Sequence, residues 1–396
     1  MLATPLALRL ASSGWGLART SGSRAVAEPR RYPAHMATLL LHAGTSKAGS
    51  TAFQKLMAAN RHELGRHGIE YFPVLKSSNH TALAAAFCHR PARVFASLGL
   101  ASDRDRRRWK RTLGRRLSRA LNAESTWVAS TEHLCSQLKT SVELEECATF
   151  LYGYFDRIAV VLVLRRADFW LPSAYQESIK AGATRRFDAG YVRTRRSVLN
   201  HPVLAGRWLA AFGPGSVACV PFLEGDKQTF HKLPERILHA GGAAPEAIEW
   251  TKPLSGLANP ALSALATEVL RIANPILRTS AVRPTTTRAR AVSYIGDHWP
   301  GPGIQLTGEA FDALDQLNLP LKAAAGSALA TGDEWSAWAD QPAAPLGSQP
   351  VLAQSEQDAI LRDLERAGLV STHQTRNWLP GRLAAKLIIP LRWARR

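Results

Sequence analysis

Lys47 lies between two glycines in a short segment that is rich in hydroxyl groups. The segment reads Gly44-Thr45-Ser46-Lys47-Ala48-Gly49-Ser50-Thr51. Glycines allow successive backbone N–H groups to turn toward one point, while a lysine and several hydroxyls add a positive charge and further donors. This combination of residues favours the binding of a phosphate or a sulfate.

A second group of polar residues follows an apolar run at 158–164. Arg165 comes directly after this run, and Ser173 lies eight residues further along. An arginine that leaves the carboxyl end of a parallel strand points toward the crevice in which α/β proteins bind ligands, and its planar guanidinium suits a phosphate. Pro172 predicts the first turn of the next helix, which would put Ser173 near free backbone donors. If the strand boundary shifts by one residue, Arg166 takes the place of Arg165.

The two glycines have the spacing of a nucleotide-hydrolase loop, but the lysine is in a different position. In the hydrolase loop, G-x-x-x-x-G-K-[ST], the lysine follows the second glycine directly. Here the lysine lies two residues before Gly49, and Ser50 and Thr51 follow that glycine. The resulting pattern, G-x-x-K-x-G-[ST]-T, resembles the 5′-phosphosulfate loop of the sulfotransferases that use 3′-phosphoadenylyl sulfate (PAPS).

The resemblance implies a donor site with two ends. Loop residues would hold the 5′-phosphosulfate, and Lys47 would also stabilise the leaving phosphate. These loop residues are Gly44, Thr45, Lys47, Gly49, Ser50 and Thr51. Arg165 and Ser173 would hold the 3′-phosphate, because sulfotransferases carry an arginine and a serine at this spacing. Where the cytosolic animal branch has an aromatic residue after the loop, this chain has Ala52, so the resemblance is to a divergent, bacterial or carbohydrate-directed branch.

Transfer of a sulfuryl group to a hydroxyl needs a general base, and two candidates lie side by side. Glu132 and His133 follow a predicted strand between the two donor motifs, where sulfotransferases often carry a glutamate or a histidine base. A histidine suits this role at neutral pH, whereas Glu132 would need a pKa raised by burial or would orient the histidine. No metal is required if Lys47 supplies the charge on the leaving side.

These residues need a parallel sheet to bring them together. Apolar runs predict strands at 38–42, 69–72, 127–130, 158–164 and 216–222. Helical spacing predicts helices at 51–66, 102–121, 169–180, 223–240 and 258–277. Such alternation is typical of an α/β three-layer sandwich with a central parallel sheet, and the resemblance implies the P-loop-like version of it. Segments 278–303 and 325–355, rich in Pro, Thr, Gly and Ala, predict irregular structure.

The charge of the chain indicates an anionic partner. The 396 residues carry a formal net charge of +19, and 46% of them are hydrophobic, as in a globular protein. An acidic glycan acceptor would suit the basic stretch 102–121 and the arginines between 185 and 196.

A P-loop kinase or nucleotide hydrolase is the alternative enzyme, and a basic nucleic-acid-binding protein is the alternative from another class. The first predicts a GK[ST] loop and an acidic residue at a strand end, and the second predicts a recognised binding motif.

The cysteines and the two ends of the chain bear on its location. Four widely spaced cysteines without a CxxC pair predict free thiols, no zinc site and a reducing, cytoplasmic compartment.

Residues 1–35 fit a disordered extension, a transit-like segment or a start assigned too early. We assign residues 36–325 to a sulfotransferase domain and 326–396 to an irregular segment plus a basic amphipathic C-terminal helix. That helix would contact an anionic membrane surface or dock on the domain.

Overall fold

The computed structural model describes most of the chain between residues 37 and 370. The described residues are 37–90, 92–121, 125–225, 231–243, 249, 251, 261–279, 284–316, 335, 341–342, 344 and 346–370. They belong to one compact unit, Ala34–Arg396. The predictions for residues 1–35 and for the C-terminal basic helix fall on residues outside this description.

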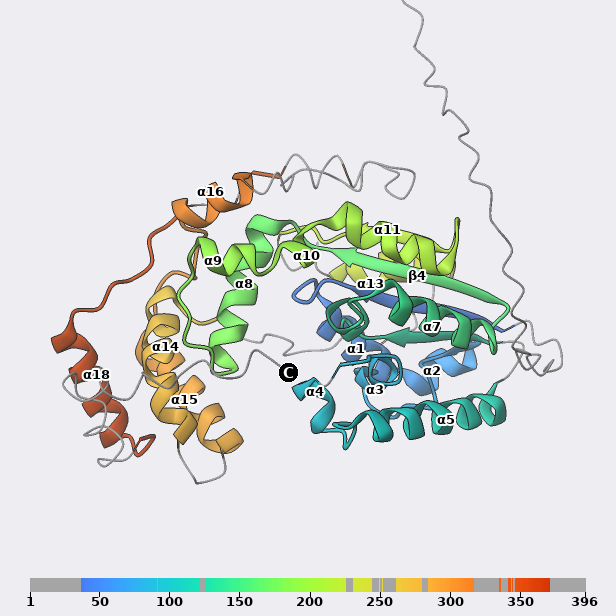
Figure 1. Ribbon diagram of the computed structural model, residues 1–396, viewed down its shortest axis with the longest axis horizontal. Helices are drawn as coiled ribbons and strands as arrows, with labels where there is room; N and C mark the ends of the chain where they lie inside the picture. Colours follow the sequence, from blue (N-terminus) through green and yellow to red (C-terminus); the bar gives the residue numbers. More distant parts are fainter. Residues whose placement is uncertain are drawn as a thin grey trace, which may run out of the picture. The chain divides into compact units, whose positions relative to one another are not determined.

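A parallel sheet of five strands forms the centre of the unit (Figure 1). Its strands are β1 (Thr38–Gly44), β2 (Ile69–Glu70), β3 (Thr126–Ser130), β4 (Arg157–Leu164) and β5 (Val217–Pro221). They lie in the order β2-β3-β1-β4-β5. After β1, the chain adds β2 and β3 on one side of it and then β4 and β5 on the other side. The carboxyl ends of β1 and β4 therefore flank the crevice at which parallel α/β sheets bind ligands.

Helices cover both faces of the sheet. Leu39 and Leu41 of β1 point into a core shared with α3 (Thr81–Ala85), α5 (Asp103–Ala120), α7 (Ser141–Tyr152) and α11 (His201–Phe212). Leu40 points into the opposite core, shared with α1 (Ser50–Ala59), α2 (Arg61–Arg66) and α13 (Leu233–Ala240). Successive residues of a strand face opposite sides, which gives the β1 run its two buried faces. The predicted α/β three-layer sandwich with a central parallel sheet is confirmed.

A separate apolar cluster is built almost entirely from helices. It joins α8 (Ala167–Lys180), which follows β4, to α9 (Ala189–Arg193), α14 (Ala264–Thr279), α15 (Pro284–His298), α16 (Gly308–Gln316) and α18 (Gln354–Arg366). The remaining short helices are α4 (Arg93–Ala96), α6 (His133–Gln137) and α10 (Arg196–Leu199). Because α8 starts at the end of β4, its first turns lie next to the ligand crevice.

Several predicted elements have different bounds in the structure. The predicted helix 51–66 is two helices separated at Asn60, and Gly68 follows the second in a left-handed conformation, as expected of a helix end. The predicted strand 69–72 ends at Glu70. Of the helix predicted over 223–240, α13 occupies Leu233–Ala240, residues 223–225 are not helical, and residues 226–230 lie outside the described part of the chain.

The prediction of irregular structure over 278–303 is wrong, because α15 occupies most of that segment. Its Pro284 lies at the first helical position, where proline is well tolerated, but the threonines that follow have low helix propensity and obscured the helix. Ala291 and Ile295 are fully buried in the helical cluster, and α15 packs against α14. Tertiary packing therefore overrides the local sequence signal.

Two further sequence predictions are tested by this description. All four cysteines are free and buried, in agreement with the expected thiols. Within the described part of the chain, none of the helices combines the length and the apolar character needed to cross a membrane.

We expect Gly44→Ala to lower the free energy of unfolding by about 2 kcal/mol or more. An added Cβ would lie 2.3 Å from the carbonyl oxygen of Val163, and the φ angle of Gly44 is +125°. Urea denaturation followed by circular dichroism would measure the loss. Gly206→Ala in α11 is the matched control, because no atom lies within 4 Å of its added Cβ, and helical alanine should leave stability unchanged or raise it. Equal losses in both variants would contradict this view of the β1–β4 contact.

Candidate functional site

The loop between β1 and α1 is tightly curled. Gly44 and Gly49 have φ angles of +125° and +77°, and Lys47 adopts +64°, which is unusual for a residue with a side chain. Arg165 stabilises this turn by donating a hydrogen bond of 2.9 Å from Nη1 to the carbonyl oxygen of Lys47. The predicted loop and the predicted arginine are therefore in direct contact.

Most amides of this loop are unpaired among the described residues. Within the described part of the chain, no N–H group of residues 46–51 donates a hydrogen bond to another residue, and the buried hydroxyl of Ser50 has no partner either. These groups surround the amino-terminal end of α1, which carries partial positive charge. Unpaired donors of this kind are costly unless an acceptor meets them, and an anion is the acceptor that suits them best.

Thr45 and Ser46 anchor the loop to neighbouring elements. The amide and the hydroxyl of Thr45 both donate to the carbonyl oxygen of Val163, at 2.9 and 3.3 Å, and the same hydroxyl accepts from the amide of Arg165. Trp170 Nε1 donates to the carbonyl oxygen of Ser46 at 2.7 Å. The polar groups of Thr45 are thus used in positioning the loop. Thr51, the last predicted loop residue, is exposed at the start of α1.

Arg165 and Ser173 line one cavity of about 270 Å³. Arg165 follows the last residue of β4, and its guanidinium forms two bonds to the carboxylate of Glu224, at 2.5 and 2.8 Å. Ser173 comes from α8, but Pro172 lies inside that helix and not in its first turn. The predicted reason for the position of Ser173, free backbone donors near the helix start, is therefore wrong, although the two residues do face the same cavity.

Arg166 has a structural role and does not replace Arg165. Its side chain is almost fully buried, forms two bonds to Asp168 at 2.9 and 2.5 Å, and donates to the carbonyl oxygens of Gln341 and Pro342. Such a buried pair is strongly destabilising to break, since one charge would be left without its partner.

Lys47 is paired with a carboxylate that the sequence analysis missed. Its Nζ atom lies 2.6 Å from Oε2 of Glu177, and both side chains are partly exposed. Glu177 is four residues after Ser173 on α8, so both project from the same face of the helix. This spacing was the available sequence signal, but only the fold brings that face to the loop.

The two candidate bases differ in their contacts. The carboxylate of Glu132 accepts hydrogen bonds from Gln54 at 3.0 Å and from Asn79 at 3.2 Å. His133 begins α6; its Nδ1 lies 3.4 Å from the hydroxyl of Ser136, and its Nε2 lies 3.9 Å from Glu132. Burial lowers the pKa of His133, and the nearby Glu132 opposes this effect. The imidazole is therefore neutral at pH 7 and able to accept a proton.

Two buried histidines, His42 and His80, lie next to these residues. His42 Nδ1 lies 2.7 Å from the hydroxyl of Ser130, and His80 Nδ1 accepts from the amide of Ser130 at 3.0 Å. The Nε2 atoms of both rings are buried and have no partner among the described residues. Burial lowers the pKa of His42 to about 4 and that of His80 to about 3. They hold the carboxyl end of β3 beside that of β1.

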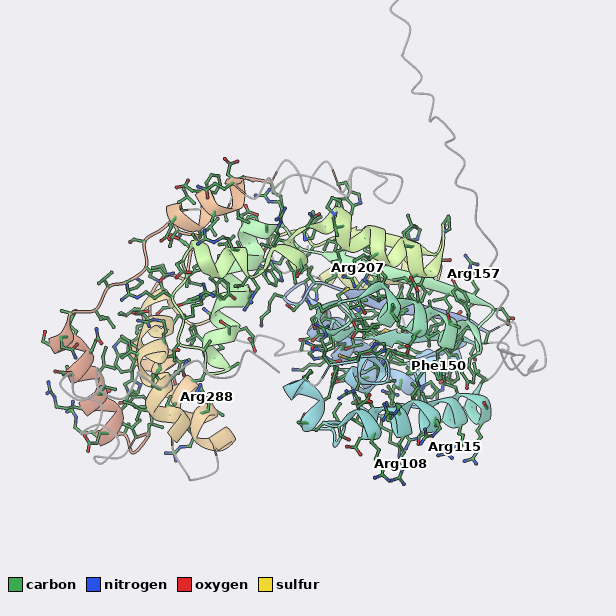
Figure 2. The ribbon with its side chains drawn as sticks, in the orientation of Figure 1. Arg108, Arg115, Phe150, Arg157, Arg207 and Arg288 are labelled. Atoms are coloured by element: carbon green, nitrogen blue, oxygen red, sulfur yellow. The ribbon has the colours of Figure 1, made fainter. Side chains whose placement is uncertain are left out.

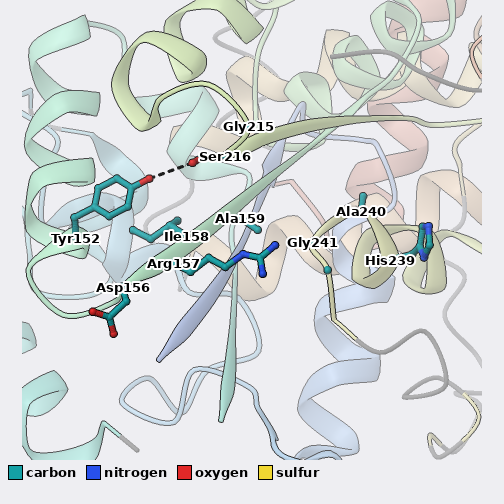
Figure 3. A pocket seen from close by; sticks show the side chains of 11 residues that line it. Tyr152, Asp156, Arg157, Ile158, Ala159, Gly215, Ser216, His239, Ala240 and Gly241 are labelled. Carbon is teal, nitrogen blue, oxygen red and sulfur yellow. Dashed lines mark hydrogen bonds between the residues drawn. The ribbon is translucent and has the colours of Figure 1, made fainter. Parts of the chain in front are cut away.

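Two of the cavities lie at opposite ends of the strands. One cavity of about 730 Å³ is lined by Gly44, Thr45 and Ser46 and by basic residues that include Arg195 of the predicted arginine cluster. Another, about 260 Å³, lies at the amino-terminal ends of β4 and β5, where Figure 3 shows Arg157 and His239. That cavity is at the opposite edge of the sheet from the loop.

The remaining basic residues lie mainly on the surface. The helix α5 exposes most of its arginines, and Arg108 and Arg115 project from it in Figure 2. Among the described residues, no three His, Cys, Asp or Glu side chains gather in a way that could hold a metal ion.

Comparisons with known proteins leave the family open. No family model matches the chain, and no curated protein matches it. Among solved structures, the chain is similar to the crystal structure of a sulfotransferase from Alicyclobacillus acidocaldarius. That match covers 56% of this chain and 86% of the other, with 15% sequence identity and a TM-score of 0.36. A likeness of this size leaves the function to be argued from the residues of the chain itself.

We expect the protein to lose stability as the pH falls below about 6.5, because His42, His80 and His201 all have lowered pKa values from burial. The unfolded chain takes up these protons near pH 6.5, whereas the folded chain resists them until about pH 4, so each histidine contributes up to about 1.4 kcal/mol per pH unit over this window. Urea midpoints between pH 7 and 4 would measure the slope.

His42→Gln or His201→Gln should make this slope shallower, and His62→Gln, at an exposed position, should not change it. A stability that is flat between pH 6.5 and 4.5 would contradict the buried neutral histidines.

Proposed function

We propose that this chain is a sulfotransferase that moves a sulfuryl group from 3′-phosphoadenylyl sulfate to an acceptor hydroxyl or amine, with a carbohydrate as the expected acceptor. The observation that carries the proposal is the contact between the curled loop and Arg165. The two lie at the ends of adjacent strands, and the loop amides of residues 46–51 have no acceptor among the described residues. One nucleotide with a phosphate at each end of its ribose matches this pair of sites.

Each part of the site has a defined task in this proposal. The loop amides and Ser50 would bind the 5′-phosphosulfate, and Arg165 with Ser173 would bind the 3′-phosphate. The acceptor oxygen attacks sulfur while the bond from sulfur to the bridging phosphate oxygen breaks, and the acceptor proton passes to His133 or Glu132. Lys47 would neutralise the charge that develops on the leaving phosphate.

Two carboxylates have to give way to the donor. Glu177 holds Lys47 and Glu224 holds Arg165 in this structure. Ion pairs between partly exposed groups contribute little net free energy, and phosphates with several charges compete well for the same cations. The pairs would keep the two cations in place before the donor binds.

The position of the lysine and the end of β4 argue against the kinase or hydrolase alternative. Lys47 precedes Gly49 instead of following it, and β4 continues into two arginines. The next carboxylate along the chain after β4, Asp168, is held by Arg166 and by the amide of Ala344. A role in holding a nucleotide-bound cation would require this buried pair to break.

We expect 3′,5′-diphosphoadenosine to raise the melting temperature more than ADP does, and more than ATP with magnesium. A ligand at one hundred times its dissociation constant stabilises the folded state by about 2.7 kcal/mol. Thermal unfolding of the full chain with each nucleotide would measure the shift. Equal or greater stabilisation by ATP with magnesium would rule out the proposed donor.

Lys47→Ala and Arg165→Ala should each weaken diphosphoadenosine binding by about tenfold or more, because each removes a charge-assisted contact to a phosphate. Isothermal titration calorimetry would give the affinities, and circular dichroism would verify the fold. Lys55→Ala, at an exposed position of α1, is the control for loss of one positive charge. Affinities unchanged in both test variants would place the phosphates elsewhere.

Glu177→Gln should tighten diphosphoadenosine binding by roughly threefold to tenfold, since Lys47 would lose its competing carboxylate. The matched control is Glu145→Gln, which removes an exposed carboxylate from α7. The same calorimetric titration applies. If Glu177→Gln binds more weakly than the unchanged chain, the carboxylate helps to bind the nucleotide and does not compete with it.

A further inference from the structure

The cavity of about 730 Å³ beside the loop is strongly basic. Gly44, Thr45 and Ser46 form one part of its wall. Four cationic side chains form much of the rest: Arg90, Lys139, Arg195 and Arg207. None of the residues that line it is an aspartate or a glutamate.

The four cations come from separate segments of the chain. Arg90 follows α3, Lys139 lies between α6 and α7, and Arg195 precedes α10. Arg207 projects from α11 (Figure 2). A solvated helix face would carry its charges on one element at helical spacing. Here the fold brings four segments together around one cavity, and such a convergence of polar groups is typical of a binding site.

These cations have little carboxylate compensation. Lys139, Arg195 and Arg207 have no carboxylate oxygen within 4.0 Å among the described residues. Arg90 lies 3.6 Å from Glu143, but that carboxylate already accepts hydrogen bonds from the amides of His89, Lys139 and Thr140. The cavity therefore retains a net positive charge.

The charges also act on one another. Burial is the main cause that lowers the pKa of Lys139; Cys135 opposes it, and Arg90, Arg207 and Arg195 each lower the pKa further by repulsion. The guanidinium groups of Arg90 and Arg207 are held by the carbonyl oxygens of Gln137 and Leu138, at 2.8 and 3.1 Å. Cations that are fixed in place and repel one another favour an anion that neutralises them.

We propose that this cavity binds the acceptor, and that the acceptor is a sugar that carries a carboxylate or a sulfate besides the hydroxyl to be modified. The inference rests on the proposed sulfotransferase activity, because it takes the loop as the donor side. A neutral phenol or lipid would bring no anionic group to these four cations.

The rest of the cavity wall suits a sugar. Ser136, Gln137, Thr194 and Ser197 offer hydroxyl and amide groups for hydrogen bonds, and Trp170 adds an aromatic ring. Ser136 also contacts His133, at 3.4 Å from Nδ1. One candidate base thus lies directly behind the wall of the cavity.

The test compares three sugars that differ in charge: glucuronic acid, galactose 6-sulfate and galactose. Each is titrated into the full chain by calorimetry at pH 7, with and without saturating 3′,5′-diphosphoadenosine. We expect at least one charged sugar to bind about tenfold or more tightly than galactose, because only it meets the cations. A preference for glucuronic acid alone would identify a carboxylate, and one for galactose 6-sulfate alone a sulfate.

Lys139→Gln combined with Arg207→Gln should abolish this preference, while Arg196→Gln, at an exposed position outside the cavity wall, should retain it. If the double variant does not fold, Lys139→Gln alone should reduce the preference. Equal binding of the three sugars by the unchanged chain would overturn the inference. So would a preference for charged sugars that the Lys139 and Arg207 variants retain in full. Diphosphoadenosine affinity measured on the same samples should not change, and a chain that selects charged sugars without binding this nucleotide would overturn the donor assignment alone.

Discussion

The close contact between Gly44 and Val163 is the constraint on which the site depends. Because Gly44 has no side chain, β1 remains paired with β4 up to its last residue, with Gly44 opposite Val163. Thr45 then bonds to the carbonyl oxygen of Val163 and to the amide of Arg165. The loop and Arg165 consequently meet at the same edge of the sheet. Any side chain at Gly44 would force these two ends of the proposed donor site apart.

Two neighbouring arginines show how burial separates a structural charge from one that a ligand can reach. Arg165 and Arg166 are adjacent in the sequence, and each pairs with a carboxylate. The Arg166–Asp168 pair is almost fully buried and also bonds to two carbonyl oxygens, so breaking it would leave buried charges unpaired. The Arg165–Glu224 pair is 15% and 22% exposed and faces a cavity. Only the second pair can exchange its carboxylate for a phosphate at low cost.

The central strands β1 and β4 were predictable from the sequence because each is a short, nearly continuous apolar run, whereas the strand predicted over 69–72 ends at Glu70. The loop was predictable because its spacing is local. The carboxylates that pair with Lys47 and Arg165 could not be predicted in this way. Glu177 is 130 residues from Lys47 in the sequence and Glu224 is 59 residues from Arg165, so only the fold brings each pair together. The basic cavity was missed for the same reason: Arg90, Lys139 and Arg207 lie on separate segments and share no spacing. Helix α15 was missed because its buried contacts outweigh weak helix formers.

The contacts of the two candidate bases favour different roles. Glu132 is held by Gln54 of α1 and by Asn79, so its carboxylate is already committed to neighbours on the donor side. The imidazole of His133 has two long contacts, 3.4 Å to the hydroxyl of Ser136 and 3.9 Å to Glu132, and Ser136 lines the basic cavity. A base must reach the acceptor proton and be unprotonated at neutral pH, and the lowered pKa of His133 meets the second condition. We therefore favour His133 as the base, with Glu132 holding the adjoining segments in place.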